Sequence, residues 1–198
     1  MLNLNNITLE RYYEPVFEPV SAQLGSGETL MVTGANGCGK TTLIRVIAGL
    51  LDASSGAIDF PEGPIAYVGH YLGLKDTLTV RENLQFYSRF HRNGKDHDID
   101  ADLKRMQIYK HADQAARSLS AGQRKRCALT RLLFQPEALW LLDEPYANLD
   151  ADGLSLVDGL LREHKERGGL AVVVSHNRMV PDDLDIKTLT VRAWSDAR

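Results

Sequence analysis

The sequence predicts an α/β fold with a parallel core sheet and an inserted helical subdomain. Short apolar runs at residues 29–33, 139–142 and 170–175 are typical of parallel strands that are covered on both faces. Helical patterns separate these runs, and strands that alternate with helices indicate an α/β domain. The alternation stops between about residues 71 and 120, which predicts an insertion.

The predicted helices of the core follow or separate these strands. They cover residues 41–50, 121–134 and 151–167. The last of them has Asp150 in the N-cap position and ends at Gly168-Gly169, and these residue types commonly start and end helices. The N-terminal residues and residues 186–191 predict edge strands.

The insertion has a helical pattern of its own. Thr79 and Glu82 have the spacing of a capping box, and an aromatic-rich helix is predicted over residues 83–90. A polar stretch at residues 91–98 follows, and residues 99–111 predict another helix. We expect a single domain over residues 1–198, with a core of residues 1–70 and 121–198 and a helical subdomain at about 71–120.

The composition is that of an ordinary globular protein. Hydrophobic residues make up 43% of the 198 residues and charged residues 25%, which is enough to bury a sizeable core. The net charge of −3 gives no general attraction to nucleic acid, so none is expected as a partner. Two cysteines form no disulfide framework and suit a reducing cytoplasm. We expect neither a signal peptide nor a membrane-spanning segment.

A phosphate-binding pattern follows the first predicted strand. Residues 34–41 read Gly-Ala-Asn-Gly-Cys-Gly-Lys-Thr, which fits a P-loop that opens a helix. Backbone amides of such a loop surround phosphate oxygens, and the helix N-terminus adds a partial positive charge. Lys40 would neutralise the β- and γ-phosphates, and Thr41 would offer its hydroxyl to Mg²⁺. The predicted ATP-binding residues are Asn36, Gly37, Cys38, Gly39, Lys40, Thr41 and Thr42. An ordinary glycine-rich turn is the alternative, and the strand–loop–helix context disfavours it.

Two carboxylates end the second buried strand. Asp143 would hold Mg²⁺ as a hard oxygen ligand, and Glu144 would accept a proton from the attacking water or orient it. On its own, an Asp-Glu pair after a strand is more often a loop start or a helix cap. The P-loop in the same chain favours the catalytic interpretation.

Residues 119–123 (Leu-Ser-Ala-Gly-Gln) complete a family pattern. Ser120 and Gln123 also have the spacing of a capping box, which alone would explain them. Together with the other motifs, in this order, they resemble an ABC ATPase over nearly the whole chain. The resemblance implies a P-loop NTPase fold of the ABC type, with a mostly parallel core sheet and an antiparallel β edge. It also implies that residues 148–150 form the D-loop and that His176 is the switch histidine.

The ABC resemblance implies a mechanism that needs two copies of the chain. ATP on the P-loop of one copy would be covered by Ser120, Gly122 and Gln123 of a second copy. A helix N-terminus delivered by the second copy then meets the γ-phosphate only when ATP is present. ATP would thereby shift an equilibrium between an open and a closed homodimer.

Two positions depart from the family pattern. His70 stands where Gln is usual, and imidazole is a poor Mg²⁺ ligand. We expect His70 to position water or to relay contact with a membrane partner, and a hinge residue of the subdomain is the alternative. Arg11 stands where an aromatic residue usually stacks on adenine, and a guanidinium plane can also stack on a base. The adjacent Tyr12 and Tyr13 are expected to pack.

One subfamily is particularly similar. The segments 69–70, 73–75, 78–79, 82–84 and 86–87, together with Arg11, Ala121 and Leu139-Trp140, resemble the ATPase subunit of bacterial cytochrome c maturation systems, which are haem exporters. This resemblance implies integral membrane permease subunits as partners and a peripheral location on the cytoplasmic face of the bacterial inner membrane. A subunit of another ABC importer or exporter is the alternative. The short gap between P-loop and signature shows no coiled-coil heptads, which disfavours chromosome-maintenance ABC proteins.

Several further residues have ordinary structural interpretations. One of the two cysteines, Cys38, is an exception. It lies in the phosphate loop beside Lys40 at a helix start, where the thiolate form of a cysteine is favoured. The residues Arg124, Lys125 and Arg126 are expected on a solvated helix face, His91, His97, His111 and His164 at the surface, Leu154, Val157, Leu160 and Leu161 in the core, and Cys127 as buried filler.

Overall fold

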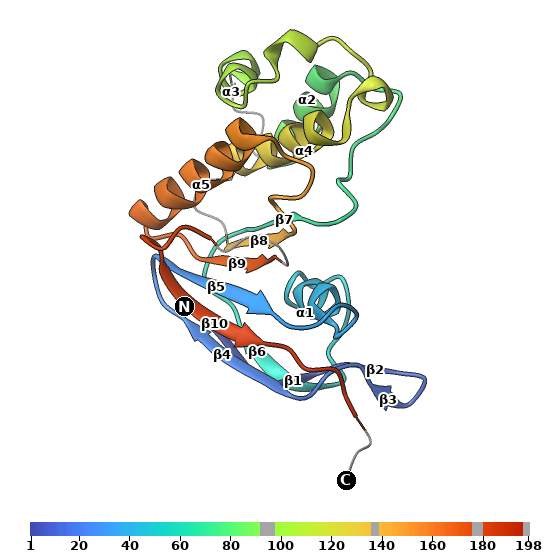
Figure 1. The fold of residues 1–198 in the computed structure, drawn as a ribbon, viewed down its shortest axis with the longest axis vertical. Helices are drawn as coiled ribbons and strands as arrows, with labels where there is room; N and C mark the ends of the chain where they lie inside the picture. Colours follow the sequence, from blue (N-terminus) through green and yellow to red (C-terminus); the bar gives the residue numbers. More distant parts are fainter. Residues whose placement is uncertain (92–97, 136–138, 176–179, 196–198) are drawn as a thin grey trace.

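The computed structural model consists of a five-stranded sheet, a three-stranded sheet, a two-stranded hairpin and a set of helices, packed around two hydrophobic clusters (Figure 1). The structure describes residues 1–91, 98–135, 139–175 and 180–195. Within these ranges, no helix is both long enough and apolar enough to cross a bilayer.

A five-stranded sheet forms the centre of the fold. Its strand order is β10 (Asp185–Thr190), β5 (Glu28–Thr33), β9 (Ala171–Val174), β8 (Leu139–Asp143) and β7 (Ile65–Val68), and every neighbouring pair is parallel. The three apolar runs therefore form strands as predicted, and residues 186–191 give an edge strand. Strand β7 was not predicted from the sequence.

Both faces of the parallel sheet are buried. Successive residues of a strand point to opposite faces, and in β8 Leu139 and Leu141 pack into one hydrophobic cluster while Trp140 and Leu142 pack into the other. The first cluster joins the sheet to α1 (Lys40–Ile47) and to the antiparallel strands. The second joins it to the helices on the opposite face. Burial on two faces explains why the strand sequences are apolar without alternation.

A three-stranded antiparallel sheet lies beyond α1 (Figure 1). Its order is β4 (Val20–Leu24), β1 (Leu2–Thr8) and β6 (Ser55–Asp59). The prediction of an N-terminal edge strand is wrong, because β1 pairs on both sides and is the central strand. A small hairpin, β2 (Glu10–Arg11) and β3 (Glu14–Pro15), projects beside this sheet (Figure 1).

The helical region covers the other face of the parallel sheet (Figure 1). Its elements are α2 (Val80–His91), α3 (Ile99–Arg105), η1 (Tyr109–His111), η2 (Ala116–Ser118), α4 (Ala121–Thr130), η3 (Arg131–Phe134) and α5 (Ala151–Glu166). The capping box of Thr79 and Glu82 is present, with hydrogen bonds of 2.8 and 3.1 Å. The predicted helix over residues 99–111 is divided, because Gln107 has a φ of 55°.

Two surface predictions are wrong. Lys125 and Arg126 are 4% and 8% exposed, so the basic run of α4 is not a solvated face. His164 is 2% exposed, and its ring stacks on Trp140 at 3.8 Å between centroids. Cys127 is fully buried, as expected.

Candidate functional site

The phosphate loop connects β5 to α1 at the carboxyl end of the parallel sheet, where ligands bind in open α/β sheets. Gly39 is the N-cap residue of α1 and has a φ of 104°. A Cβ atom at this position would lie 2.7 Å from the ring of the buried Phe17. Both the left-handed backbone and the close approach therefore require glycine here.

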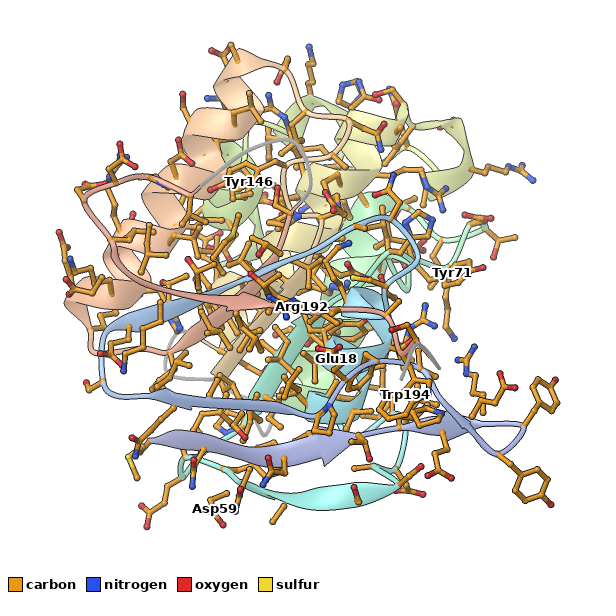
Figure 2. All side chains as sticks on the ribbon, turned by 60° about the horizontal axis from the view of Figure 1, so that its bottom comes forward. Glu18, Asp59, Tyr71, Tyr146, Arg192 and Trp194 are labelled. Carbon is orange, nitrogen blue, oxygen red and sulfur yellow. The ribbon has the colours of Figure 1, made fainter. Side chains whose placement is uncertain are left out.

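The segment that carries Phe17 is itself anchored to the C-terminal segment. The amide of Glu18 donates to the carbonyl of Arg192 at 3.0 Å, and Figure 2 shows these two residues close together. Phe17 also forms an antiparallel bridge with Ala193. These contacts fix one wall against which the P-loop packs.

Lys40 lies inside the phosphate loop. It is 4% exposed, and its Nζ donates to the carbonyl oxygens of Gly34 at 2.9 Å and Ala35 at 2.6 Å. Cys38 Sγ lies 3.8 Å from the same Nζ. A buried ammonium held by neutral carbonyls would gain from a fully charged phosphate oxygen, because charge-assisted hydrogen bonds are the stronger ones.

Thr41 and Asp143 are brought together from positions 102 residues apart. The hydroxyl of Thr41 donates to Asp143 Oδ1 at 3.4 Å. Asp143 is 1% exposed, and its Oδ2 has no hydrogen-bond partner among the described atoms. A buried carboxylate oxygen without a donor is costly unless a cation satisfies it.

The donor set at Thr41 and Asp143 fits Mg²⁺ shared with phosphates. Mg²⁺ usually takes one or two protein oxygens and completes its octahedron with waters and phosphate oxygens. In the described ranges, no three or more His, Cys, Asp or Glu side chains form a cluster that could hold a metal by themselves. The Thr41 hydroxyl and the Asp143 carboxylate supply the small number of protein oxygens that Mg²⁺ usually takes.

Glu144 follows Asp143 in a left-handed conformation, with a φ of 53°. Its amide donates to the carbonyl of Val174 at 2.9 Å, which holds the turn against β9. Further along the turn, the buried hydroxyl of Tyr146 donates to Asp158 of α5 at 2.8 Å. Contacts with β9 and with α5 thus hold the backbone around Glu144 from two sides; Tyr146 is labelled in Figure 2.

A cavity of about 390 Å³ lies beside Glu144. His70, Lys125 and Asn148 are among the residues that line it. Burial lowers the pKa of Lys125, and the charges of Asp143 and Glu144 oppose that shift. The structure thus brings His70 and Glu144 to one cavity, although they are 74 positions apart in the chain.

The signature residues start α4. The Ser120 hydroxyl accepts from the amide of Gln123 at 3.2 Å, and Gln123 Oε1 accepts from the amide of Ser120 at 2.9 Å. The capping-box interpretation is therefore correct. The same residues are also placed to contact a ligand or a partner, because this helix start lines a cavity of about 600 Å³.

The signature cavity is separate from the phosphate loop. Its described lining residues are Gln107, Lys110, His111, Ser120, Ala121, Gly122, Gln123, Arg126, Asn148, Asp150 and Asp152, and none of these belongs to the P-loop. This cavity therefore brings no described P-loop residue next to the signature.

Arg126 connects the signature helix to the start of α5. Its guanidinium donates to Asp150 at 2.5 Å and to Gln107 at 2.9 Å. The amide of Gly153 and then the Arg126 guanidinium lower the pKa of the Asp150 carboxyl. Asp150 is thus the N-cap residue of α5, as predicted, and its ion pair with Arg126 also connects the start of α5 to α4.

The remaining predicted residues have different surroundings. Asn36 and Gly37 are exposed in the loop, and Thr42 is half-buried in α1. Arg11 lies exposed in the small hairpin, and the prediction that Tyr12 and Tyr13 pack is wrong, because they are 96% and 98% exposed. His97 and His176 lie outside the described residues, as does the side chain of His91, so the predictions for them are not tested.

Sequence reasoning missed two residues near the site. Lys125 lies four residues after Ala121, so both lie on one helix face, and both line the cavity at Glu144. Arg131 is 9% exposed and donates to the carbonyl of Leu72 at 2.7 Å, which ties the segment after His70 to the end of α4. Helical spacing could have indicated the first, but the second depends on a contact between distant segments.

Comparisons with known proteins agree with this geometry. A family model described as ABC transporter matches residues 17–147. The cytochrome c biogenesis ATP-binding export protein CcmA of Xanthomonas oryzae pv. oryzae (strain MAFF 311018) is 40% identical over 202 residues, which cover 98% of this chain and 94% of that protein. The protein of the same name from Cereibacter sphaeroides is 42% identical over 175 residues, with 88% and 82% covered.

Two solved structures share the fold. A putative ABC transporter ATP-binding protein from Pyrococcus furiosus aligns with a TM-score of 0.79 at 20% identity, and 96% of each chain is covered. A dimeric post-hydrolysis state of the ATP-binding cassette MJ0796, bound to ADP and Pi, aligns with a TM-score of 0.77 at 25% identity, with 89% of this chain and 88% of that chain covered.

The predicted fold class, a P-loop NTPase of the ABC type, is confirmed by these structures. The family resemblance is confirmed by a family model that covers more than half of the chain and by relatives of 40% identity over nearly its whole length. This chain therefore belongs to the ABC transporter family and is an ABC ATPase of the group that contains the cytochrome c biogenesis ATP-binding export proteins.

Proposed function

We propose that this chain binds Mg²⁺ and ATP and hydrolyses the nucleotide as the ATPase subunit of a haem-export system for cytochrome c maturation. The observation that carries the catalytic part is the meeting of Lys40, Thr41 and the partnerless Oδ2 of Asp143 at one sheet edge. The relatives named as cytochrome c biogenesis ATP-binding export proteins support the biological role.

Phosphate binding would use groups that are already positioned. Lys40 exchanges two neutral carbonyl acceptors for phosphate oxygens, and the amides from Asn36 to Thr42 surround the phosphates at the N-terminus of α1. Mg²⁺, when bound, neutralises charge on the β- and γ-phosphates. Thr41 and Asp143 would hold that ion through a hydroxyl and a carboxylate oxygen.

Glu144 would act on the attacking water. It borders the cavity beside Asp143, and a carboxylate there can accept the proton that water loses. His70 lines the same cavity and would position this water in place of the usual glutamine. His176 would complete the set from the segment after β9, and Arg11 would stack on adenine.

The complete site would need two copies of the chain. The signature cavity supplies a helix N-terminus and polar side chains but no described P-loop residue. In a symmetric dimer, Ser120, Gly122 and Gln123 of one copy would cover ATP on the P-loop of the other. ATP binds the closed pair better than the open one, and hydrolysis removes this difference, so the pair opens.

The membrane partners would be integral permease subunits, with this chain peripheral on the cytoplasmic face of the bacterial inner membrane. Exposed aromatic side chains beside His70 and on α2 support a docking surface in this part of the molecule. Tyr71 is 83% exposed, Phe90 68% and Phe86 45%, and Figure 2 shows Tyr71 at the margin of the molecule. Purification of the intact complex from membranes, with identification of the co-purified subunits, tests this assignment.

The catalytic proposal is tested by Glu144→Gln. We expect hydrolysis to fall by roughly 10²-fold or more, the usual scale for a lost general base, while ATP binding is kept. The variant should accumulate as an ATP-dependent dimer in size-exclusion chromatography. Glu166→Gln, an exposed position at the end of α5, is the matched control and should hydrolyse ATP normally. Normal turnover in Glu144→Gln, or no nucleotide uptake in calorimetry with Mg²⁺, would contradict the proposal.

A further inference from the structure

The side-chain amide of Gln123 contacts two polar groups, and the second of these, His111, is itself held by Gln114. Gln123 Oε1 accepts from the Ser120 amide at 2.9 Å, and Gln123 Nε2 lies 3.0 Å from His111 Nε2. The other ring nitrogen of His111, Nδ1, lies 3.0 Å from Gln114 Oε1. His111 therefore connects the signature to η1 from outside the signature motif.

The donors and acceptors in this chain of contacts have only one consistent arrangement. A backbone N–H can only donate, so the oxygen of Gln123 must face Ser120 and its NH₂ must face His111. Since that NH₂ donates, His111 Nε2 must be an unprotonated acceptor. The proton of the neutral imidazole is then on Nδ1, where it donates to Gln114 Oε1.

Protonation of His111 would break this arrangement. An imidazolium carries N–H groups at both nitrogens, so Nε2–H would face the NH₂ of Gln123. If Gln123 turned its amide over to accept from His111, its NH₂ would face the Ser120 amide instead. Either way two donors oppose each other, and the Gln123 side-chain amide loses one of its two hydrogen bonds, to His111 or to the Ser120 amide.

We propose that His111 is a positioning residue that holds the Gln123 side chain in the orientation required for the signature to cover ATP in a second copy. The proposal rests on the two-copy site proposed above. It further implies that ATP-dependent closure weakens in acid, because imidazole is the side chain that changes charge between pH 5 and 8.

The surroundings of His111 contain charges of both signs. The charged side chains that line the same cavity are Lys110 of η1, Arg126 of α4, and Asp150 and Asp152 at the start of α5. Arg126 and Asp150 form an ion pair at 2.5 Å, so the pair brings no net charge near the ring. The acid response must therefore be assigned by comparing variants rather than from the pH profile of the native chain alone.

The experiment measures ATP-dependent dimerisation of the full chain in the Glu144→Gln background between pH 5.5 and 8.5. Sedimentation with excess Mg²⁺ and ATP gives the dimer dissociation constant at each pH. With His111 present, we expect affinity to fall in acid by roughly tenfold per site, the scale of one lost hydrogen bond.

Three variants separate positioning from a merely structural role. His111→Gln keeps an acceptor that cannot be protonated, so dimerisation should match the native affinity at pH 8 and lose the acid dependence. His111→Lys is a permanent donor and should be weak at every pH. Gln114→Glu places a carboxylate on Nδ1–H, which favours the imidazolium and should move the midpoint of the acid loss to higher pH.

The outcomes distinguish this inference from the proposed function. If the native-His111 chain forms no ATP-dependent dimer at pH 8, the two-copy site is wrong and the inference falls with it. If the dimer forms but His111→Gln shows the same acid loss, or Gln114→Glu leaves the midpoint unmoved, only the role of His111 is overturned. Circular dichroism at each pH verifies that the variants stay folded.

Discussion

Gly122 of the signature helix lies directly against the backbone of Asn148. A Cβ atom added at Gly122 would stand 2.6 Å from the Asn148 carbonyl oxygen, a distance at which the two segments must separate. Asn148 itself has a φ of 65°, so its backbone has little freedom to yield. The start of α4 and the loop that follows Glu144 are therefore one packed unit.

This contact predicts the effect of Gly122→Ala. We expect it to lower ATP hydrolysis by about tenfold or more, because displacement of site residues by about 1 Å can cost up to 10²-fold. Overpacking should also cost about 1–3 kcal/mol of unfolding free energy. Steady-state ATPase assays and thermal denaturation check both. Gly159→Ala in α5, where an added Cβ atom meets nothing within 4 Å, is the control and should change activity little. Equal losses in both variants would contradict a specific role of the Gly122–Asn148 contact.

The partnerless oxygen of Asp143 leads to a prediction about Mg²⁺. A ligand that binds only the folded chain raises its stability, by about 2.7 kcal/mol at a concentration one hundred times its dissociation constant. We expect ATP with Mg²⁺ to raise the melting temperature by more than ATP with EDTA. Asp143→Asn should remove this difference, because the amide no longer offers a charged oxygen.

Asp59→Asn is the matched control for the Mg²⁺ experiment. Asp59 is an exposed carboxylate of β6 in the antiparallel sheet, away from the P-loop (Figure 2). Its variant should keep the additional Mg²⁺-dependent increase. An unchanged increase in Asp143→Asn would remove Asp143 from the metal site.

The buried Lys125 predicts a pH-dependent gain in stability on substitution. Burial lowers its pKa below the ordinary 10.5, so between the two pKa values the unfolded chain binds more protons and stability rises with pH. The penalty of burying the charged form is fully present below the folded pKa. Lys125→Met should therefore be more stable than the native chain at pH 7, and the difference should shrink as the pH rises toward 10.5.

Denaturant titrations at several pH values measure this difference. Arg124→Met, on the same helix but half-buried and paired with Asp76 at 2.7 Å, is the control and should show no such gain. A less stable Lys125→Met at pH 7 would mean that attraction to Asp143 and Glu144 outweighs the burial penalty.

The parts of the site that are local in sequence could be predicted, and the parts that depend on packing could not. The P-loop and the capping box of Ser120 and Gln123 follow from spacing alone, because their partners are within a few residues. The central position of β1 depends on its pairing with two strands that are distant in the chain, so composition gave no indication of it. The contact of Gln123 with His111 is likewise long-range.

The burial of the signature-helix cations and of His164 was missed for a different reason. Lys, Arg and His side chains are usually exposed, so their residue type alone predicts a surface position. His164 in fact continues the stripe of Val157, Leu160 and Leu161 with helical spacing, so the pattern itself indicated the core.

The stack of His164 on Trp140 provides the last prediction. The two rings are nearly parallel, at 7° and 3.8 Å, and His164 Nε2 contacts the Leu170 carbonyl at 3.0 Å. This stack joins the end of α5 to β8. His164→Ala should cost about 2–4 kcal/mol of unfolding free energy through lost packing and a lost hydrogen bond. Urea unfolding followed by tryptophan fluorescence and circular dichroism measures the cost.

The matched variant His164→Phe separates the two contributions of this residue. It keeps an aromatic ring against Trp140 but removes the nitrogen that contacts Leu170, so it should recover part of the loss. His111→Ala, a half-buried histidine outside the core, should cost far less stability. ATP binding should survive in all three variants, because α5 meets the sheet here through its C-terminal turn, whereas the P-loop lies at the carboxyl ends of the strands. If His164→Ala unfolded no more easily than His111→Ala, the stack would contribute nothing to the core.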